Sequence, residues 1–210
     1  MTTRVGIYFF PDVEVLDFAG PYEVFTTASR VFLRQNPSAN PPFEVFTLSE
    51  GGSAIKARAG LNVLPDQGID QHPPIDLLII PGGIVTAERG KPAVIQWIAT
   101  QARQTRLTAS ICTGAFLLAE TGLLQDRKAT THWEDLADLQ HDFPEIQVVA
   151  DCSWVDEGDI ITSGGISAGI DMSLHLVERL AGPDLALATA RQMAFRWRRE
   201  NESPLRQEVE

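Results

Sequence analysis

The chain has 210 residues, 44% of them hydrophobic and 21% charged, so it is long enough for one full-sized domain with its own hydrophobic core. A formal net charge of -11 argues against a surface that binds nucleic acid or an anionic membrane, because phosphate groups require a positive field. No apolar stretch approaches the roughly 18 residues that cross a bilayer.

The two cysteines and the N-terminal residues indicate the compartment. Cys112 and Cys152 are compatible with a reducing environment in which free thiols persist. The first ten residues enter a strand-like run directly, without the charged and apolar regions of an export signal. We therefore expect a cytoplasmic protein.

Short apolar runs alternate with helical patterns along the chain, which is typical of a mostly parallel sheet covered on both faces. We predict strands at Val5–Phe10, Phe43–Leu48, Leu77–Ile80, Leu107–Ile111, Ala129–Thr131 and Ile160–Thr162. We predict helices at Pro21–Leu33, Thr86–Arg103, Gly114–Thr121, Glu134–Asp138, Gly169–Leu180 and Asp184–Arg198. The expected fold is a three-layer, doubly wound α/β domain.

Two hairpins and a tail complete the predicted organisation. One hairpin joins Ala54–Ala57 to Asn62–Leu64 at the sheet's edge, and another joins Ser153–Val155 to Gly158–Thr162. Neither carries obvious chemistry. We predict a single domain over residues 1–200, followed by a polar tail over residues 201–210 that is disordered unless a partner holds it.

Cys112 lies where an apolar strand turns abruptly into a helix. The strand Leu107–Ile111 runs into Cys112, and Thr113 and Gly114 then reverse the chain, as in a nucleophile elbow. Exposure at the strand end, nearby free backbone N–H groups and the positive end of a helix all favour a thiolate. The alternative is that Cys112 is a small apolar core residue, the usual role of a buried cysteine.

Gly82 and Gly83 follow another buried strand and lack side chains that would keep a ligand away from the backbone. The N–H groups of Gly83 and Thr113 could form an oxyanion-type hole for charge that develops during nucleophilic attack. Alternatively, the two glycines only shape a turn.

Five segments resemble the ThiJ/PfpI family of class I glutamine amidotransferase-like proteins, and the match runs from Val5 to about Gly182. These segments are Val15–Pro21, Leu78–Gly83, Ser110–Gly114, Ala129–Trp133 and Thr162–Asp171. The resemblance implies a flavodoxin-like fold, no cofactor and a homodimer. Asp17, Gly20 and Pro21, together with Cys112 and Thr113, are most similar to the isonitrile hydratase branch of that family.

This branch implies hydration of a small isonitrile to an N-substituted formamide. By the resemblance, Cys112 is the nucleophile, Asp17 is the acidic residue that touches its sulfur, and Thr113 shapes the pocket. Asp17 follows the first strand, at the sheet edge expected for Cys112, so the two groups would share one proton and Asp17 would act as general acid. Its alternative role is a helix N-terminal acid stabilised by the dipole.

Other activities of the related proteins remain open. Protease-like members have His directly after the cysteine, and Thr113 stands there instead, so peptidase activity loses support. Deglycase-like members place Glu where this chain has Asp17, so that activity or another hydrolase activity is an alternative. A third possibility is a redox or ligand sensor, because the N-terminal domain of AraC-type regulators has a similar pattern around Cys112 and His132.

The four histidines and Cys152 have no metal-binding spacing, so we expect no metal. His132 matches a position near the active site of the family, and we interpret it as a hydrogen-bonded histidine that supports the pocket rather than as the catalytic base. The glycine-rich stretch Ser163–Gly169 lacks phosphate-loop spacing and is predicted to be a strand-to-helix junction that lines the pocket.

Overall fold

A seven-stranded sheet forms the centre of the computed structural model, which describes residues 1–199. The strands are β1 (Thr3–Phe9), β2 (Phe43–Ser49), β5 (Gln67–Gly68), β6 (Leu77–Ile80), β7 (Leu107–Ile111), β10 (Trp154–Asp156) and β11 (Ile160–Ser163). Their order is β10-β11-β7-β6-β1-β2-β5, and every neighbouring pair is parallel except β10 with β11. The predicted mostly parallel, doubly wound sheet is confirmed.

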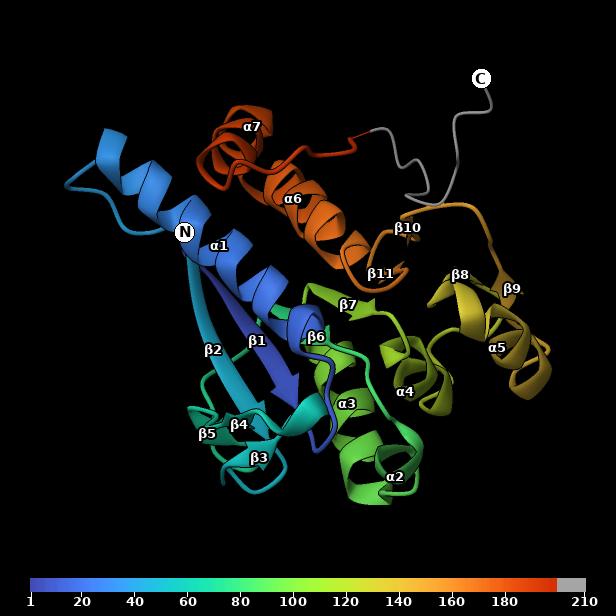
Figure 1. The fold of residues 1–210 in the computed structure, drawn as a ribbon. Coiled ribbons are helices and arrows are strands. Elements are labelled where there is room, and N and C mark those ends of the chain that lie inside the picture. The colour runs from blue at the N-terminus through green and yellow to red at the C-terminus, as the bar shows by residue number, and fades with distance from the viewer. Residues whose placement is uncertain (200–210) are drawn as a thin grey trace.

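Helices cover both faces of this sheet (Figure 1). On one face lie α1 (Val15–Gln35), α6 (Ala168–Ala181) and α7 (Pro183–Gln192), which pack against one another. The other face carries α2 (Thr86–Arg89), α3 (Pro92–Gln104) and α4 (Gly114–Glu120). The chain leaves β1 toward β2 on one side and later toward β6 on the other, which makes the β1–β6 boundary the point where ligands bind in such sheets.

Two small additions lie beside the main sheet. The antiparallel pair β3 (Ile55–Lys56) and β4 (Asn62–Val63) encloses the short 3-10 helix η1 (Arg58–Gly60). In the parallel pair β8 (Lys128–Ala129) and β9 (Gln147–Val148), β9 packs against α5 (Leu136–Asp142), which also contacts the 3-10 helix η2 (Trp133–Asp135).

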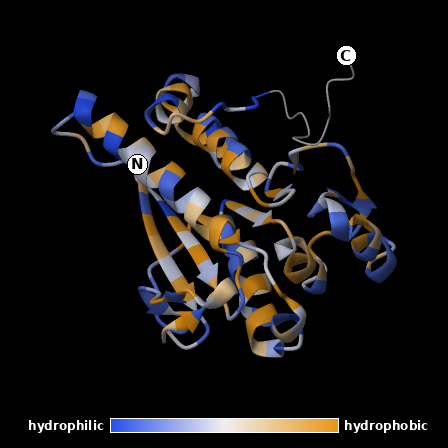
Figure 2. Cartoon of the chain, in the orientation of Figure 1, coloured by the Kyte–Doolittle hydropathy of each residue, from blue (hydrophilic) through white to orange (hydrophobic). Residues whose placement is uncertain are grey.

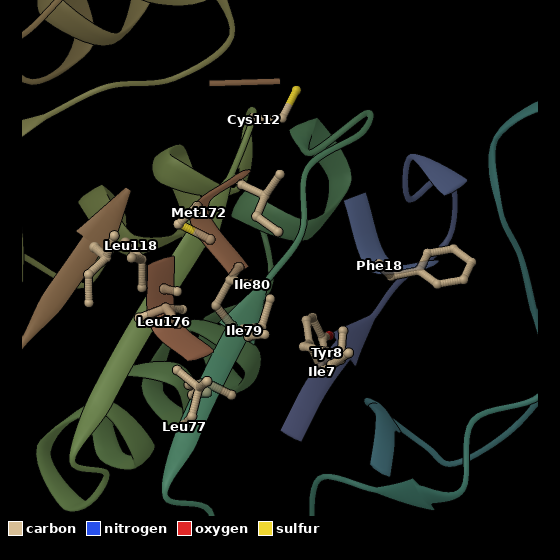
Figure 3. Close-up of a cluster of buried hydrophobic side chains, with 14 of the residues drawn as sticks. Ile7, Tyr8, Phe18, Leu77, Ile79, Ile80, Cys112, Leu118, Met172 and Leu176 are labelled. Carbon is tan, nitrogen blue, oxygen red and sulfur yellow. The ribbon is translucent and has the colours of Figure 1, made fainter. Parts of the chain in front are cut away.

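The hydrophobic core lies between the sheet and its two helical layers. Hydrophobic residues are concentrated on the central strands and along α3 and α6, whereas hydrophilic and hydrophobic residues are mixed in α5 and in the β3–β5 region (Figure 2). Ile7, Leu77 and Ile79 from the sheet are fully buried, as is Leu176 from α6. Figure 3 shows Cys112 at the end of this cluster, with its sulfur pointing away from Ile80 and Met172.

The structure corrects several predicted helix boundaries. The first helix begins at Val15 rather than at Pro21 and therefore includes Asp17. The predicted helix 86–103 is two helices, because the chain passes through extended Lys91 before Pro92 starts α3. The last helix ends at Gln192 instead of Arg198, and Arg198 donates its backbone N–H and its guanidinium to buried Asp171.

The structure also corrects one strand and one hairpin position. The predicted strand 129–131 is only the two-residue β8, and it pairs with β9 outside the main sheet. The first predicted hairpin forms as β3 and β4, but β5 is the edge strand of the main sheet. The second hairpin is present as β10 and β11.

Residues 201–210, predicted to be a polar tail, lie outside the described part of the chain. Within residues 1–199, no helix has both the length and the apolar character needed to cross a membrane.

The packing of α6 on the sheet yields a stability prediction. Leu176→Ala removes a fully buried side chain and leaves a cavity, so we expect the free energy of unfolding to fall by about 2–5 kcal/mol. The control is Leu187→Ala on α7, where the side chain is half exposed and a much smaller change is expected. Urea unfolding monitored by circular dichroism measures both; equal effects would contradict the buried position of Leu176.

Candidate functional site

Three segments that follow the parallel strands β1, β6 and β7 meet at one edge of the sheet. Asp17 lies in the first turn of α1 after β1, Gly82 follows β6, and Cys112 follows β7. Asp17 is fully buried, and its Oδ2 accepts a hydrogen bond of 3.1 Å from the Gly82 N–H. Its carboxyl group also interacts with the Cys112 thiol, so the structure brings the two predicted residues together.

Cys112 occupies a strained turn that the surrounding backbone holds in place. Its φ of 56° lies in the left-handed region, which is uncommon for residues other than glycine. The Cys112 N–H donates to the Ser163 carbonyl at 3.0 Å, and the Cys112 carbonyl accepts from Thr131 Oγ1 at 2.8 Å. This is the geometry of a nucleophile elbow, with the side chain presented at the end of the strand.

Two glycines let the elbow pack tightly on the segment after β6. A Cβ on Gly114 would lie 2.2 Å from the Ile80 carbonyl oxygen, and a Cβ on Gly82 would lie 2.6 Å from the Thr113 nitrogen. Neither position has room for a side chain. Gly82 and Gly114 therefore allow the β6 and β7 strand ends to approach each other.

The Gly83 N–H is not available as an oxyanion donor. It donates to Thr113 Oγ1 at 2.8 Å, and the same hydroxyl donates to the Gly83 carbonyl at 2.8 Å. The Gly82 N–H is engaged by Asp17. Of the predicted donors, the Thr113 N–H acts on the sulfur, because it lowers the pKa of the Cys112 thiol.

The electrostatics differ from the prediction that the turn favours a thiolate. Burial raises the pKa of the Cys112 thiol, and the neighbouring Asp17 charge raises it further, while the Thr113 N–H lowers it. Burial also raises the pKa of Asp17 to about 7, against the hydrogen bond from Gly82. Since two negative charges in this dry site are unfavourable, the thiol keeps its proton while Asp17 loses its own proton near pH 7.

A pocket of about 450 Å³ opens above Cys112. Four of its nine lining residues carry charged side chains, and Arg58 Nη1 lies 3.5 Å from Glu14 Oε2. The sequence analysis did not identify Arg58. The β3–β4 hairpin brings this residue to the pocket of Cys112, which is more than fifty positions away in the chain. The lining residues are Glu14, Arg58, Gly83, Cys112, Thr113, His132, Glu134, Asp135 and Ile166.

His132 reaches the site but is not held as predicted. Its Nδ1 is buried and has no hydrogen-bond partner within residues 1–199, and its Nε2 lies 3.5 Å from Glu134 Oε2. A Cβ on Gly165 would lie 2.6 Å from this Nδ1 and 2.7 Å from Cys112 Sγ. Gly165 therefore lies against both groups, and the glycine-rich junction lines the pocket as predicted.

The remaining histidines do not contribute to this pocket. His72 Nε2 accepts a hydrogen bond from Trp97 Nε1 at 3.2 Å, and His175 Nε2 lies 2.7 Å from Asp156 Oδ2. Cys152 is a half-buried free thiol in a neighbouring depression. Cys152 does not lie at a turn from a strand into a helix.

Comparison with known proteins gives a consistent family match. Residues 3–179 match the DJ-1/PfpI family. An isonitrile hydratase of Pseudomonas putida is 31% identical over 93% of this chain and 79% of its own length. The transcriptional regulator GbdR of Pseudomonas aeruginosa is 30% identical over 91% of this chain, which spans 50% of the regulator.

Solved structures show the same fold. The crystal structure of DJ-1beta from Drosophila melanogaster covers 94% of this chain with a TM-score of 0.79 and 22% identity, and the match spans 100% of that chain. A ThiJ/PfpI family protein from Pseudomonas syringae has a TM-score of 0.80 over 93% of this chain and 76% of its own, at 22% identity.

The Asp17–Cys112 contact predicts how the thiol reacts. In a Cys152→Ser background, where Cys112 is the only thiol, alkylation by iodoacetamide is expected to be slow at pH 7 and to accelerate as pH rises. Asp17→Asn removes the neighbouring charge, so the pKa of Cys112 falls and alkylation at pH 8 becomes faster. An unchanged pH profile in Asp17→Asn would show that the two groups are not coupled.

Proposed function

Because this chain belongs to the DJ-1/PfpI family, we propose that it is a cysteine-dependent, cofactor-free hydratase that converts a small isonitrile to an N-substituted formamide. The observation that carries the proposal is the buried Asp17 carboxyl next to the Cys112 thiol, with an Asp17 pKa of about 7. Such a pair can move a proton between sulfur, substrate and water near neutral pH.

The first half of the reaction forms a covalent intermediate. Asp17 accepts the thiol proton, and the Cys112 sulfur forms a bond with the terminal carbon of the isonitrile. The electron pair left on this carbon takes the proton back from Asp17, which gives a thioimidate on Cys112. The Thr113 N–H stabilises negative charge on sulfur while the bond forms.

The second half releases the product. Water adds its oxygen to the same carbon, and one water proton goes to the substrate nitrogen. The carbon–sulfur bond then breaks, sulfur leaves with the electron pair, and the remaining hydroxyl proton passes through Asp17 to sulfur. The product is the N-substituted formamide, and the Asp17–Cys112 pair again holds one proton.

Hydrogen bonds that fix the turn around Cys112 support the proposed role of this residue. Thr113 Oγ1 bonds to both backbone polar groups of Gly83, which fixes the segment after β6 against the elbow. Thr131 Oγ1 holds the Cys112 carbonyl from another segment. A nucleophile held this firmly loses little freedom when it attacks. The reducing cytoplasm in which we place the protein would keep Cys112 as a free thiol.

A second candidate function is a ligand-sensing domain without turnover. The observation that favours it is the 30% identity to GbdR over 91% of this chain. In that case, the pocket above Cys112 would bind a small molecule that leaves unchanged. The two candidates differ in one measurement, which is whether product accumulates.

The direct test is formation of N-cyclohexylformamide from cyclohexyl isonitrile by the purified protein. We expect turnover that Cys112→Ala abolishes and that Asp17→Asn lowers by about 10²–10⁴-fold, the range for a lost proton-transfer group. Cys152→Ser is the matched control and should retain activity, because Cys152 is outside the Cys112 pocket. Intact turnover in Cys112→Ala would remove the proposal. If the wild type is inactive while iodoacetamide still alkylates Cys112, a hydrolase, deglycase or sensor function replaces the proposed hydratase activity.

The pH dependence of turnover has a predicted direction. Protonation of Asp17 below its pKa of about 7 removes the group that accepts the thiol proton. The value of kcat/KM should therefore fall about tenfold per pH unit well below pH 7. A rate that is flat between pH 5 and pH 7 would assign the proton transfer to another group. Stopped-assay product measurements across this range, in buffers of constant ionic strength, distinguish the outcomes.

A further inference from the structure

One wall of the pocket above Cys112 belongs to a segment that lies outside the main sheet. His132, Glu134 and Asp135 form this wall, and they lie in η2 or directly before it. The chain continues from η2 into α5, which contacts mainly η2 and β9. Figure 1 shows α5, β8 and β9 grouped at one side of the sheet, beside α4. Residues 132–143 are called the η2–α5 segment below.

The residues just before the η2–α5 segment are held firmly to the main sheet. The Thr130 N–H donates to Thr162 Oγ1 at 2.9 Å, and Thr131 Oγ1 donates to the Cys112 carbonyl at 2.8 Å. Beyond these two threonines, the segment is half-buried or exposed, apart from fully buried Leu139. The segment is therefore fixed where it leaves the sheet and less tightly packed further along.

A cleft of about 300 Å³ separates the η2–α5 segment from α2. Three aspartates line the cleft on the side of the segment, namely Asp135, Asp138 and Asp142. Arg89 on α2 is the one cation that lines the cleft within residues 1–199. Gly83, Thr113 and Asp135 line both the cleft and the pocket above Cys112. The space behind the pocket wall is thus not filled by side chains, and the carboxylates around it repel one another.

Arg89 connects the two sides of this cleft. Its Nη2 lies 2.9 Å from Asp142 Oδ2 on α5, and its Nε donates to Glu120 Oε1 on α4 at 2.8 Å. The guanidinium carbon lies 5.2 Å from the centroid of the Phe116 ring on α4 and 5.5 Å from that of Phe143, directly after α5. A planar guanidinium can serve two carboxylates and two rings at once. One side chain therefore joins α2, α4 and the end of the η2–α5 segment.

We propose that Arg89 is a positioning residue for the cysteine site. By binding Asp142, it holds the η2–α5 segment against α2 and α4 and so keeps the wall of three polar side chains in place beside Cys112. Without this contact, repulsion among the carboxylates widens the cleft, and the wall moves away from the pocket. The inference rests on the proposed function only for its effect on turnover, since access to Cys112 is measured separately.

The two carboxylate partners of Arg89 provide matched variants. Asp142→Asn removes the ion pair that crosses the cleft, whereas Glu120→Gln removes the ion pair between α2 and α4 and leaves the cleft bridged. The two carboxylate side chains are similarly exposed, at 35% for Asp142 and 31% for Glu120. Each variant removes one negative charge, so the overall charge does not distinguish them.

Access to Cys112 is measured by labelling in a Cys152→Ser background, with N-cyclohexylmaleimide and with the smaller iodoacetamide. The ratio of the two rates reports how much room the pocket offers, because a change in the thiol pKa affects both reagents alike. We expect Asp142→Asn to raise this ratio about two- to fivefold, which is the effect of a partly exposed ion pair on an equilibrium, and Glu120→Gln to leave it unchanged. An unchanged ratio in Asp142→Asn would overturn the proposal, and so would an equal rise in both variants.

Turnover separates a positioning role from a loss of folded protein. Arg89→Met removes both ion pairs and keeps an unbranched side chain. We expect it to raise KM for cyclohexyl isonitrile about twofold or more with kcat nearly unchanged, because substrate binds only the molecules whose wall is in place. Unfolding would instead lower kcat at constant KM, and that result would contradict the proposal. Absence of turnover in the wild type would count against the proposed function, and the labelling ratio would then decide alone whether Arg89 positions the wall.

Discussion

The contact between the buried Asp17 carboxyl and the Cys112 thiol is the interaction on which the rest of the site depends. Burial opposes charge on either group, so the pKa of both is raised. The cost of burying them is partly offset by N–H groups of Gly82 and Thr113, one for each partner. The raised pKa values keep the Cys112 thiol protonated, whereas a cysteine at such a turn without a buried carboxyl beside it would favour the thiolate.

The fold explains why these groups meet. In the strand order β10-β11-β7-β6-β1-β2-β5, the segments after β1, β6 and β7 lie at one edge, next to the point where the chain reverses its direction of winding. Gly82 and Gly114 permit contacts that no side chain would allow. The strain at Cys112, with φ of 56°, is supported by hydrogen bonds from Thr131 and to Ser163.

The pocket above Cys112 adjoins a second depression, and His132 and Ile166 line both. Four charged side chains line the pocket that contains Cys112, whereas Asp151 is the charged residue that lines the second depression within the described part of the chain. Related proteins with similar identity include both an isonitrile hydratase and a transcriptional regulator. Family membership therefore determines the scaffold, and the activity depends on what these two regions bind.

Local sequence patterns determined the α/β class, the buried strands 77–80 and 107–111 and the elbow at Cys112, because alternation of apolar runs and the demands of a tight turn are properties of neighbouring residues. The resemblance to the ThiJ/PfpI family pointed to Asp17 as the partner of Cys112. Tertiary structure alone decided the raised thiol pKa, the engagement of the Gly83 N–H by Thr113, the unpaired Nδ1 of His132 and the position of Arg58. Each of these depends on burial or on contacts between segments distant in the chain, and local patterns carry no information about either.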